Sequence, residues 1–123
     1  MNKKITIYLK KQGVTDKDFF SFMLGTKDKD LCFKLCSVDG FDFMVSHFFD
    51  DSEQSGYGLI STNDMLKTTG SQFTAFGLIE GDDVICLNSS NGAIYIWLIQ
   101  TGNGEYIKVS RSFKEFINEC IEL

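Results

Sequence analysis

The 123-residue sequence predicts an α+β domain: a mostly antiparallel sheet of about five to six strands, N-terminal helices, a short middle helix and a C-terminal helix. The first observation is a series of short apolar runs in the second half, each bounded by turn-forming residues, as in consecutive strands. These runs are Phe73–Ile79, Val84–Leu87, Ala93–Ile99 and Tyr106–Val109. The second observation is that the apolar period then changes from two to nearly four, which is typical of a helix.

The N-terminal segment Lys3–Lys11 fits two interpretations. Its alternating apolar residues suit a strand, whereas Ile5, Tyr8 and Leu9 also mark one face of a helix. We favour the helix, because Gly13 can end it and a second helical pattern follows at once.

A second helix is predicted to begin after Thr15, whose hydroxyl can accept a hydrogen bond from the amide three residues later. Asp18 is its capping-box partner. Phe19, Phe22 and Met23 then line one side, and Gly25 ends the segment.

The middle of the chain predicts a hairpin and a short helix. Leu31–Ser37 and Phe41–Phe49 read as strands around Asp39-Gly40, a strong hairpin signal. An acidic loop, Asp50–Gly58, follows. Ser61–Leu66 is expected to form a short helix capped by its first serine.

The C-terminal helix is predicted from a capping box in which Ser112 is the cap and Glu115 its partner. Its buried face has the helical spacing and comprises Phe113, Phe116, Ile117, Cys120 and Ile121. No linker or repeat divides the chain, so residues 1–123 are expected to form one domain.

Composition narrows the class of protein. A net charge of −5 argues against nucleic-acid binding, which needs a basic surface, but would suit a basic protein partner. No apolar run approaches the roughly 18 residues of a membrane helix, and the N-terminus lacks the apolar segment of a signal peptide. We therefore expect a cytoplasmic protein; its oligomeric state cannot be read from the sequence.

The cysteines and acids do not predict a metal, cofactor or catalytic site. Cys32 and Cys36 are close in sequence, but no second pair or nearby His completes a zinc site, and buried thiols are the simpler interpretation. The single histidine, His47, leaves a small hydrolase as an alternative. Asp50-Asp51 and Asp82-Asp83 are more typical of solvated turns than of paired catalytic carboxylates. We expect no enzyme.

Trp97 allows two interpretations. Trp often anchors protein interfaces, but this residue lies in the most continuous apolar strand, which favours core packing. Tyr95 shares a strand face with Trp97, so the same expectation applies to it.

The order of elements in the second half resembles the SUKH superfamily. The matching segments are Ser61–Leu66, Phe73–Gly77, Gly81–Leu87, Gly92–Trp97 and Ser112–Ile117. The resemblance implies a non-enzymatic binding domain. Bacterial members are immunity proteins that neutralise a cognate toxin, often a nuclease, by stoichiometric binding. Fungal relatives are regulatory scaffolds, so a regulatory module with an endogenous partner is the alternative.

The acidic loops are the candidate surface for a basic toxin domain. If the strands Phe41–Phe49 and Phe73–Ile79 end on the same side, their loops form one negative rim that mimics a nucleic-acid backbone. The alternative is that these acids are solvated turn residues. Phe48 and Phe49, with Tyr57, are expected to supply an apolar centre. The candidate partner-binding residues are Asp50, Asp51, Glu53, Tyr57, Glu80, Asp82 and Asp83.

Overall fold

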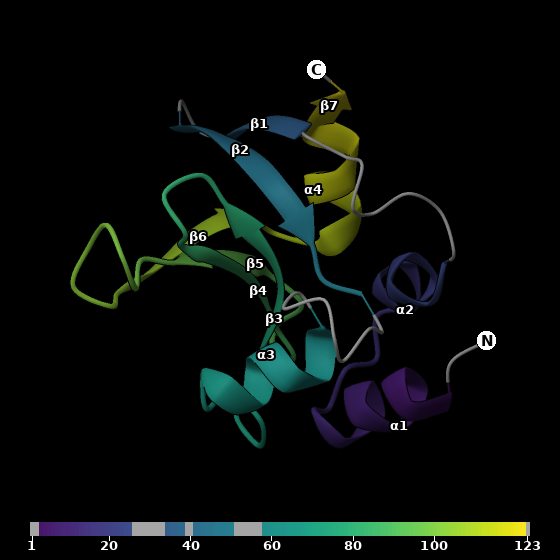
Figure 1. Cartoon of the computed structure of the whole chain (residues 1–123). Helices are drawn as coiled ribbons and strands as arrows, with labels where there is room; N and C mark the ends of the chain where they lie inside the picture. The colour runs from purple at the N-terminus through teal and green to yellow at the C-terminus, as the bar shows by residue number, and fades with distance from the viewer. Residues whose placement is uncertain (1–2, 26–33, 39–40, 51–57, 123) are drawn as a thin grey trace.

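The computed structural model describes residues 3–25, 34–38, 41–50 and 58–122, and it shows helices packed against a curled sheet (Figure 1). The helices are α1 (Lys3–Lys11), α2 (Lys17–Leu24), α3 (Leu59–Met65) and α4 (Phe113–Glu119). The strands are β1 (Lys34–Val38), β2 (Phe41–Phe48), β3 (Phe73–Ile79), β4 (Val84–Asn88), β5 (Ile94–Trp97), β6 (Tyr106–Ser110) and β7 (Cys120–Glu122). The predicted α+β class is confirmed, as is the choice of a helix for α1.

The strands form one antiparallel sheet in the order β6-β5-β4-β3-β2-β1-β7. Strands β1 to β6 neighbour each other in chain order, as their short connections predict. The seventh strand was not predicted, because Cys120–Glu122 has the apolar spacing of the preceding helix. Cys120 pairs with Cys36 on the edge of β1, so a tertiary contact ends α4 at Glu119.

Two predicted helix caps are wrong and one is confirmed. The cap of α2 is Asp16, not Thr15, and its carboxylate accepts from the Phe19 amide at 3.1 Å. A carboxylate at this position also interacts favourably with the helix dipole. Helix α3 begins after Gly58 instead of Ser61, where the Leu59 amide donates to the Asp50 carbonyl. Ser112 caps α4 as predicted, accepting from the Glu115 amide.

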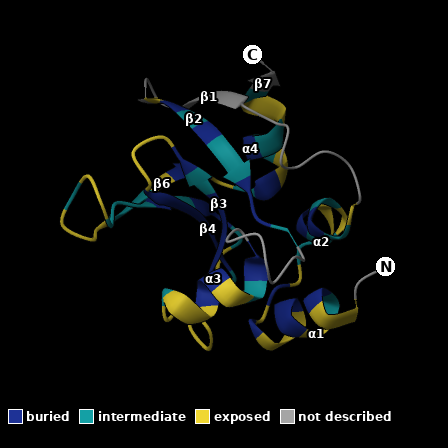
Figure 2. Ribbon diagram, viewed as in Figure 1, coloured by how far each residue is buried: buried dark blue, intermediate teal, exposed yellow. Residues whose placement is uncertain are grey.

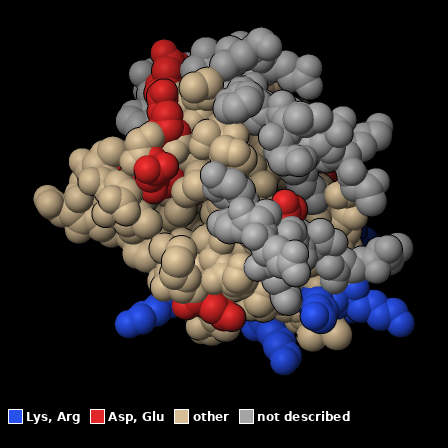
Figure 3. Space-filling model, viewed as in Figure 1, with Lys and Arg blue, Asp and Glu red and all other residues tan. Residues whose placement is uncertain are grey.

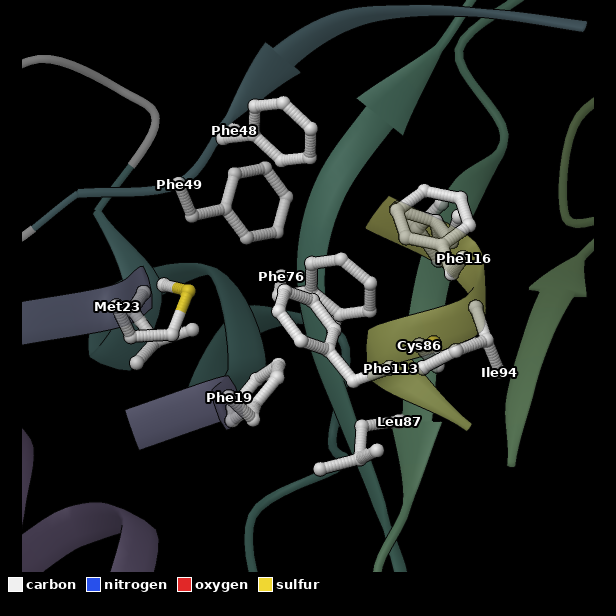
Figure 4. Packing of buried hydrophobic residues seen from close by; sticks show 14 of the residues in the cluster. Phe19, Met23, Phe48, Phe49, Phe76, Cys86, Leu87, Ile94, Phe113 and Phe116 are labelled. Atoms are coloured by element: carbon white, nitrogen blue, oxygen red, sulfur yellow. The ribbon is translucent and has the colours of Figure 1, made fainter. Parts of the chain in front are cut away.

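The core lies between the sheet and helices α2 and α4, and it is mainly aromatic. Phe19 from α2 and Phe113 from α4 pack edge-to-face at 5.1 Å, and both contact Phe76 of β3 (Figure 4). Phe116 contacts Phe76 and stacks on Phe43 of β2. Figure 2 shows buried residues along the sheet and on the inner sides of the helices. These contacts fix one sheet face as the inner face.

Two buried carboxamides join α1 and α3 to the edge of β3. Strand β2 pairs with the second half of β3, and the Phe49 amide makes the last bond, to the Phe76 carbonyl. Before that point, Asn63 of α3 donates to the Ala75 carbonyl at 2.9 Å and accepts from its amide at 2.8 Å. Gln12, just after α1, donates to the carbonyls of Phe73 and Thr68. The side chains of Asn63 and Gln12 thus make the hydrogen bonds to the first half of β3 that a neighbouring strand would otherwise make.

The described residues contain no helix that is long and apolar enough to cross a membrane.

Candidate functional site

The two acidic segments lie at opposite ends of the β2–β3 pair. The antiparallel register sets Val45 opposite Ile79, and the Glu80 amide donates to the Met44 carbonyl near the start of β2. Asp50 follows the other end of β2. The C-terminal ends of two antiparallel neighbours cannot lie on the same side. The condition for a single negative rim is therefore not met.

A different acidic surface forms beside the turn between β3 and β4. Glu80 and Asp82 are exposed in that turn, and Asp42 is exposed at the start of β2. The hydrogen bond from Glu80 to Met44 places the turn against this end of β2. Figure 3 shows acidic side chains gathering at this end of the sheet. We call Asp42, Glu80 and Asp82 the acidic group.

Asp83 does not belong to this surface, because its side chain is turned inward and 1% exposed. Its carboxylate accepts from the Gln100 amide at 2.7 Å, the Thr101 amide at 3.1 Å and the Thr101 hydroxyl. Burial opposes ionisation of this carboxyl, but the three donated bonds lower its pKa below the usual value. Asp83 therefore anchors the segment after β5.

Replacing Asp83 by alanine is expected to lower the unfolding free energy by about 1–3 kcal/mol at pH 7, because two partly buried amides and a hydroxyl lose a charged acceptor. The folded-state pKa lies below the unfolded value, so this stabilisation is present above roughly pH 4 and is lost as the pH falls through the folded pKa. Urea unfolding at a series of pH values should show the difference from wild type shrinking in acid. The exposed Glu80→Ala is the control, and a difference that stays constant with pH would contradict this role.

The other candidates from the acidic loop are placed only in part. Asp51, Glu53 and Tyr57 lie outside the described residues. Asp50 is half-buried, and its carbonyl accepts from Leu59 at the start of α3. Phe48 and Phe49 are buried in the core, 1% and 0% exposed. The prediction that these two aromatic residues lie at an interface is therefore wrong, because both side chains are already covered by the protein itself.

The expectation that Trp97 and Tyr95 pack in the core is met only in part: Trp97 packs against the core cluster, but both side chains are half-buried. Burial alternates along β5: Ile94 and Ile96 are fully buried, whereas Tyr95 and Trp97 are half-buried. Alternate residues of a strand point to opposite faces. Tyr95 and Trp97 therefore lie on the sheet face opposite the aromatic core, which we call the outer face.

Four aromatic rings gather on the outer face. The Trp97 ring stacks on Tyr106 at 5.2 Å, Tyr106 stacks on Phe73 at 4.0 Å, and Phe73 meets Tyr95 edge-to-face at 5.5 Å. Strands β3 and β6 would lie about 14 Å apart in a flat sheet. Contact between Phe73 and Tyr106 therefore shows that the sheet curls toward this face. We call Phe73, Tyr95, Trp97 and Tyr106 the outer aromatic cluster.

Polar bonds fix the orientation of two of these rings. The Trp97 indole donates from Nε1 to the Gly104 carbonyl at 2.9 Å, and the Tyr95 hydroxyl accepts from Asn91 at 3.0 Å. Burial raises the pKa of Tyr106 to about 12, so its phenol stays neutral at physiological pH. The cluster is therefore a neutral, oriented aromatic surface.

The outer face continues as an apolar row across the sheet. Leu78 lies opposite Val84, Val84 opposite Trp97, and Trp97 opposite Tyr106. Glu80 lies two residues after Leu78, directly after the end of β3 at Ile79. The acidic group thus borders the apolar row.

The described residues offer few groups for chemistry. They contain no cluster of His, Cys, Asp and Glu that could hold a metal ion. Burial raises the pKa of the free Cys86 thiol well above its usual value, so this cysteine is a poor nucleophile. His47 lies opposite Leu78 in the β2–β3 pair and is half-buried.

Sequence reasoning missed the outer aromatic cluster, although its signal was present. Tyr95 and Trp97 alternate with the two isoleucines of β5, and Phe73 and Tyr106 begin other strands. When a strand is apolar throughout, its sequence does not show which of the two sets of alternate residues faces the helices. Asp42 was missed because only loop acids were considered.

A family model described as SMI1 / KNR4 family (SUKH-1) matches residues 8–119. The match includes α2 to α4 and most of the sheet. No curated protein matches the chain.

Proposed function

Since the chain belongs to the SMI1 / KNR4 family (SUKH-1), we propose that it is a bacterial immunity-type protein that neutralises a cognate toxin by stoichiometric binding in the cytoplasm. A basic nuclease domain is the expected class of toxin, and no turnover takes place. The observation that carries the proposal is the family match over most of the chain, because this family indicates a protein-interaction function. A regulatory module with an endogenous partner is the alternative within the same family.

The surface charge supports a basic partner. The chain carries a net charge of −5, and the acidic group is exposed at the β3–β4 turn and the start of β2. A nuclease holds phosphates with lysine and arginine, so carboxylates can occupy the same cationic site. Complementary charges chiefly speed the encounter between two proteins and orient it.

The test is growth rescue by co-expression with toxic products of neighbouring reading frames, followed by measurement of complex stoichiometry. Rescue with a stable complex and with no change in the toxin's covalent structure supports the proposal. A toxin degraded or modified by this protein would contradict it. A partner that is not toxic would favour the regulatory alternative.

Neutralising two residues of the acidic group should slow association with the toxin about tenfold or more and weaken its dependence on salt. The variant is Glu80→Gln with Asp82→Asn; asparagine suits the positive φ of 66° at position 82. The matched control is Asp18→Asn with Glu119→Gln, which removes the same charge from exposed positions on α2 and α4. Stopped-flow association rates at several salt concentrations compare the acidic-group variant with the control variant. Equal rates for both variants would exclude the acidic group.

A further inference from the structure

We propose that the outer face of β3–β6 is the docking surface for a basic protein, and that the outer aromatic cluster receives lysine or arginine side chains from it. The proposal takes the existence of a protein partner from the proposed function, but it concerns where that partner docks. It replaces the acidic loops as the main contact.

The apolar row on the outer face is unusual for a surface in contact with water. A sheet face that meets water usually carries polar side chains between the buried ones. Here, Leu78, Trp97 and Tyr106 on the outer face pack against the core cluster but stay only half-buried, so part of each apolar side chain is accessible. The helices α2 and α4 pack on the inner face through Phe19, Phe113 and Phe116, so these two helices are engaged on the opposite side of the sheet.

The aromatic rings of the outer face are held in place before any partner binds. Trp97 is stacked on Tyr106 and bonded to the carbonyl of Gly104, and Tyr106 is in turn stacked on Phe73. Rigid Trp and Tyr side chains lose little conformational entropy on binding, and they dominate the energetics of protein interfaces. This geometry provides a ready contact surface.

The chemistry of the outer face favours a basic partner. A lysine or arginine above an aromatic ring is attracted to the π face, and nearby carboxylates add to that attraction. Asp42, Glu80 and Asp82 border the apolar row, whereas the exposed lysines of α1 lie along a different edge (Figure 3). A cationic protein segment with apolar neighbours fits both features.

The same charges disfavour two other occupants. In a two-fold dimer through this face, the acidic groups of the two copies would approach each other. Nucleic acid would meet the carboxylates with its phosphates. Lys108, exposed on β6 opposite Tyr95, is the cation at the far edge and can set the partner's orientation.

The experiment selects binders from a random peptide library displayed on phage, so it requires no known toxin. Trp97 is the only tryptophan in the chain, and its fluorescence reports directly on this face. We expect the enriched peptides to contain arginine or lysine beside apolar residues and to alter Trp97 fluorescence. Peptides without an excess of basic residues, or that leave the fluorescence unchanged, would overturn the proposal.

Variants then localise the binding. Trp97→Ala should weaken the Kd of the selected peptides about thirtyfold, as expected for an aromatic anchor. Trp97→Leu keeps most of the apolar volume and is the variant to use if Trp97→Ala does not fold. Its affinity for the selected peptides should still fall about tenfold, because leucine has no π face.

Met65→Ala on α3, exposed and away from the sheet, is the control and should bind as wild type. Equal affinity of the Trp97 variants and wild type, or loss of binding in the control, would count against this face. A self-associated protein that Trp97→Ala returns to monomer would make the occupant a second copy and also overturn it.

The outcome is separable from that of the proposed function. If basic peptides bind here but no neighbouring product is toxic, the docking surface stands and the immunity function falls. If a toxin is neutralised equally well by a folded Trp97→Leu variant, the immunity function stands and this docking surface falls.

Discussion

Replacing Asn63 by alanine is expected to lower the unfolding free energy by about 3 kcal/mol, a large share of the roughly 5–15 kcal/mol of a domain of this size. Asn63 is 0% exposed and uses both ends of its amide. It donates to the carbonyls of Leu59 and Ala75 and accepts from the Ala75 amide and the Thr68 hydroxyl. Alanine leaves the Ala75 amide and carbonyl without this partner, although the Thr68 hydroxyl can still donate to the carbonyl of residue 63, and an unpaired buried amide or carbonyl is costly.

Urea unfolding followed by circular dichroism measures this loss. Asn118→Ala is the matched control, because Asn118 is exposed on α4, and it should change stability by no more than about 0.5 kcal/mol. A loss at position 63 no larger than that of the control would show that Asn63 does not hold α3 to β3.

Replacing Phe76 by alanine is expected to cost about 3–5 kcal/mol, the usual range for removing a buried phenylalanine. Its ring is 0% exposed and meets those of Phe19, Phe113 and Phe116 at 5.2, 5.6 and 5.9 Å. The register between β3 and β4 shifts at Phe76, which is the extra residue of a bulge. Its side chain therefore joins α2, α4 and the sheet, and alanine leaves a cavity between all three.

Phe73→Ala is the matched control for this prediction, since it removes the same side chain from the same strand. Phe73 is half-buried on the outer face, so its loss should be clearly smaller. Thermal and urea unfolding of both variants give the comparison. Equal losses would mean that the outer face contributes to stability as the core does, which would also weaken the case for the docking surface.

The sequence predicted the strands well because their signals are local. Turn residues bound each apolar run from Phe73 to Val109, and a short connection leaves a strand little choice but its neighbour. The hairpin of β1 and β2 followed from Asp39-Gly40 in the same way, and its register pairs Val38 with Phe41.

Helix boundaries depended on contacts that no local pattern contains. Helix α3 begins where the Leu59 amide meets the Asp50 carbonyl, so the cap expected at Ser61 was misplaced. The chain leaves α4 at Cys120 because the edge of β1 offers backbone partners to a strand there. Apolar spacing alone cannot distinguish a helix end from a short strand.

The sequence predicted that the candidate surface is negatively charged, but not which residues form it. Sequence reasoning identified Glu80 and Asp82 as exposed turn acids, which they are, but grouped them with Asp83 and Asp50. The Asp83 carboxylate is buried and accepts three hydrogen bonds. Antiparallel pairing of β2 and β3 places Asp50 at the opposite end of β2 from Glu80 and Asp82. Asp42, the third member of the acidic group, is distant from Glu80 and Asp82 in sequence and is brought near them only by the register of β2 and β3.

By itself the sequence determined the fold class, the order of the strands, the acidic character and the family, because each rests on patterns within a few residues or on their order along the chain. Only the tertiary structure decided which face of β5 is covered by helices. That choice depends on where α2 and α4 pack, and it places Trp97 on the outer face and Phe76 in the core. The curl of the sheet then brings Phe73 against Tyr106, a contact that the spacing of residues along the chain does not reveal.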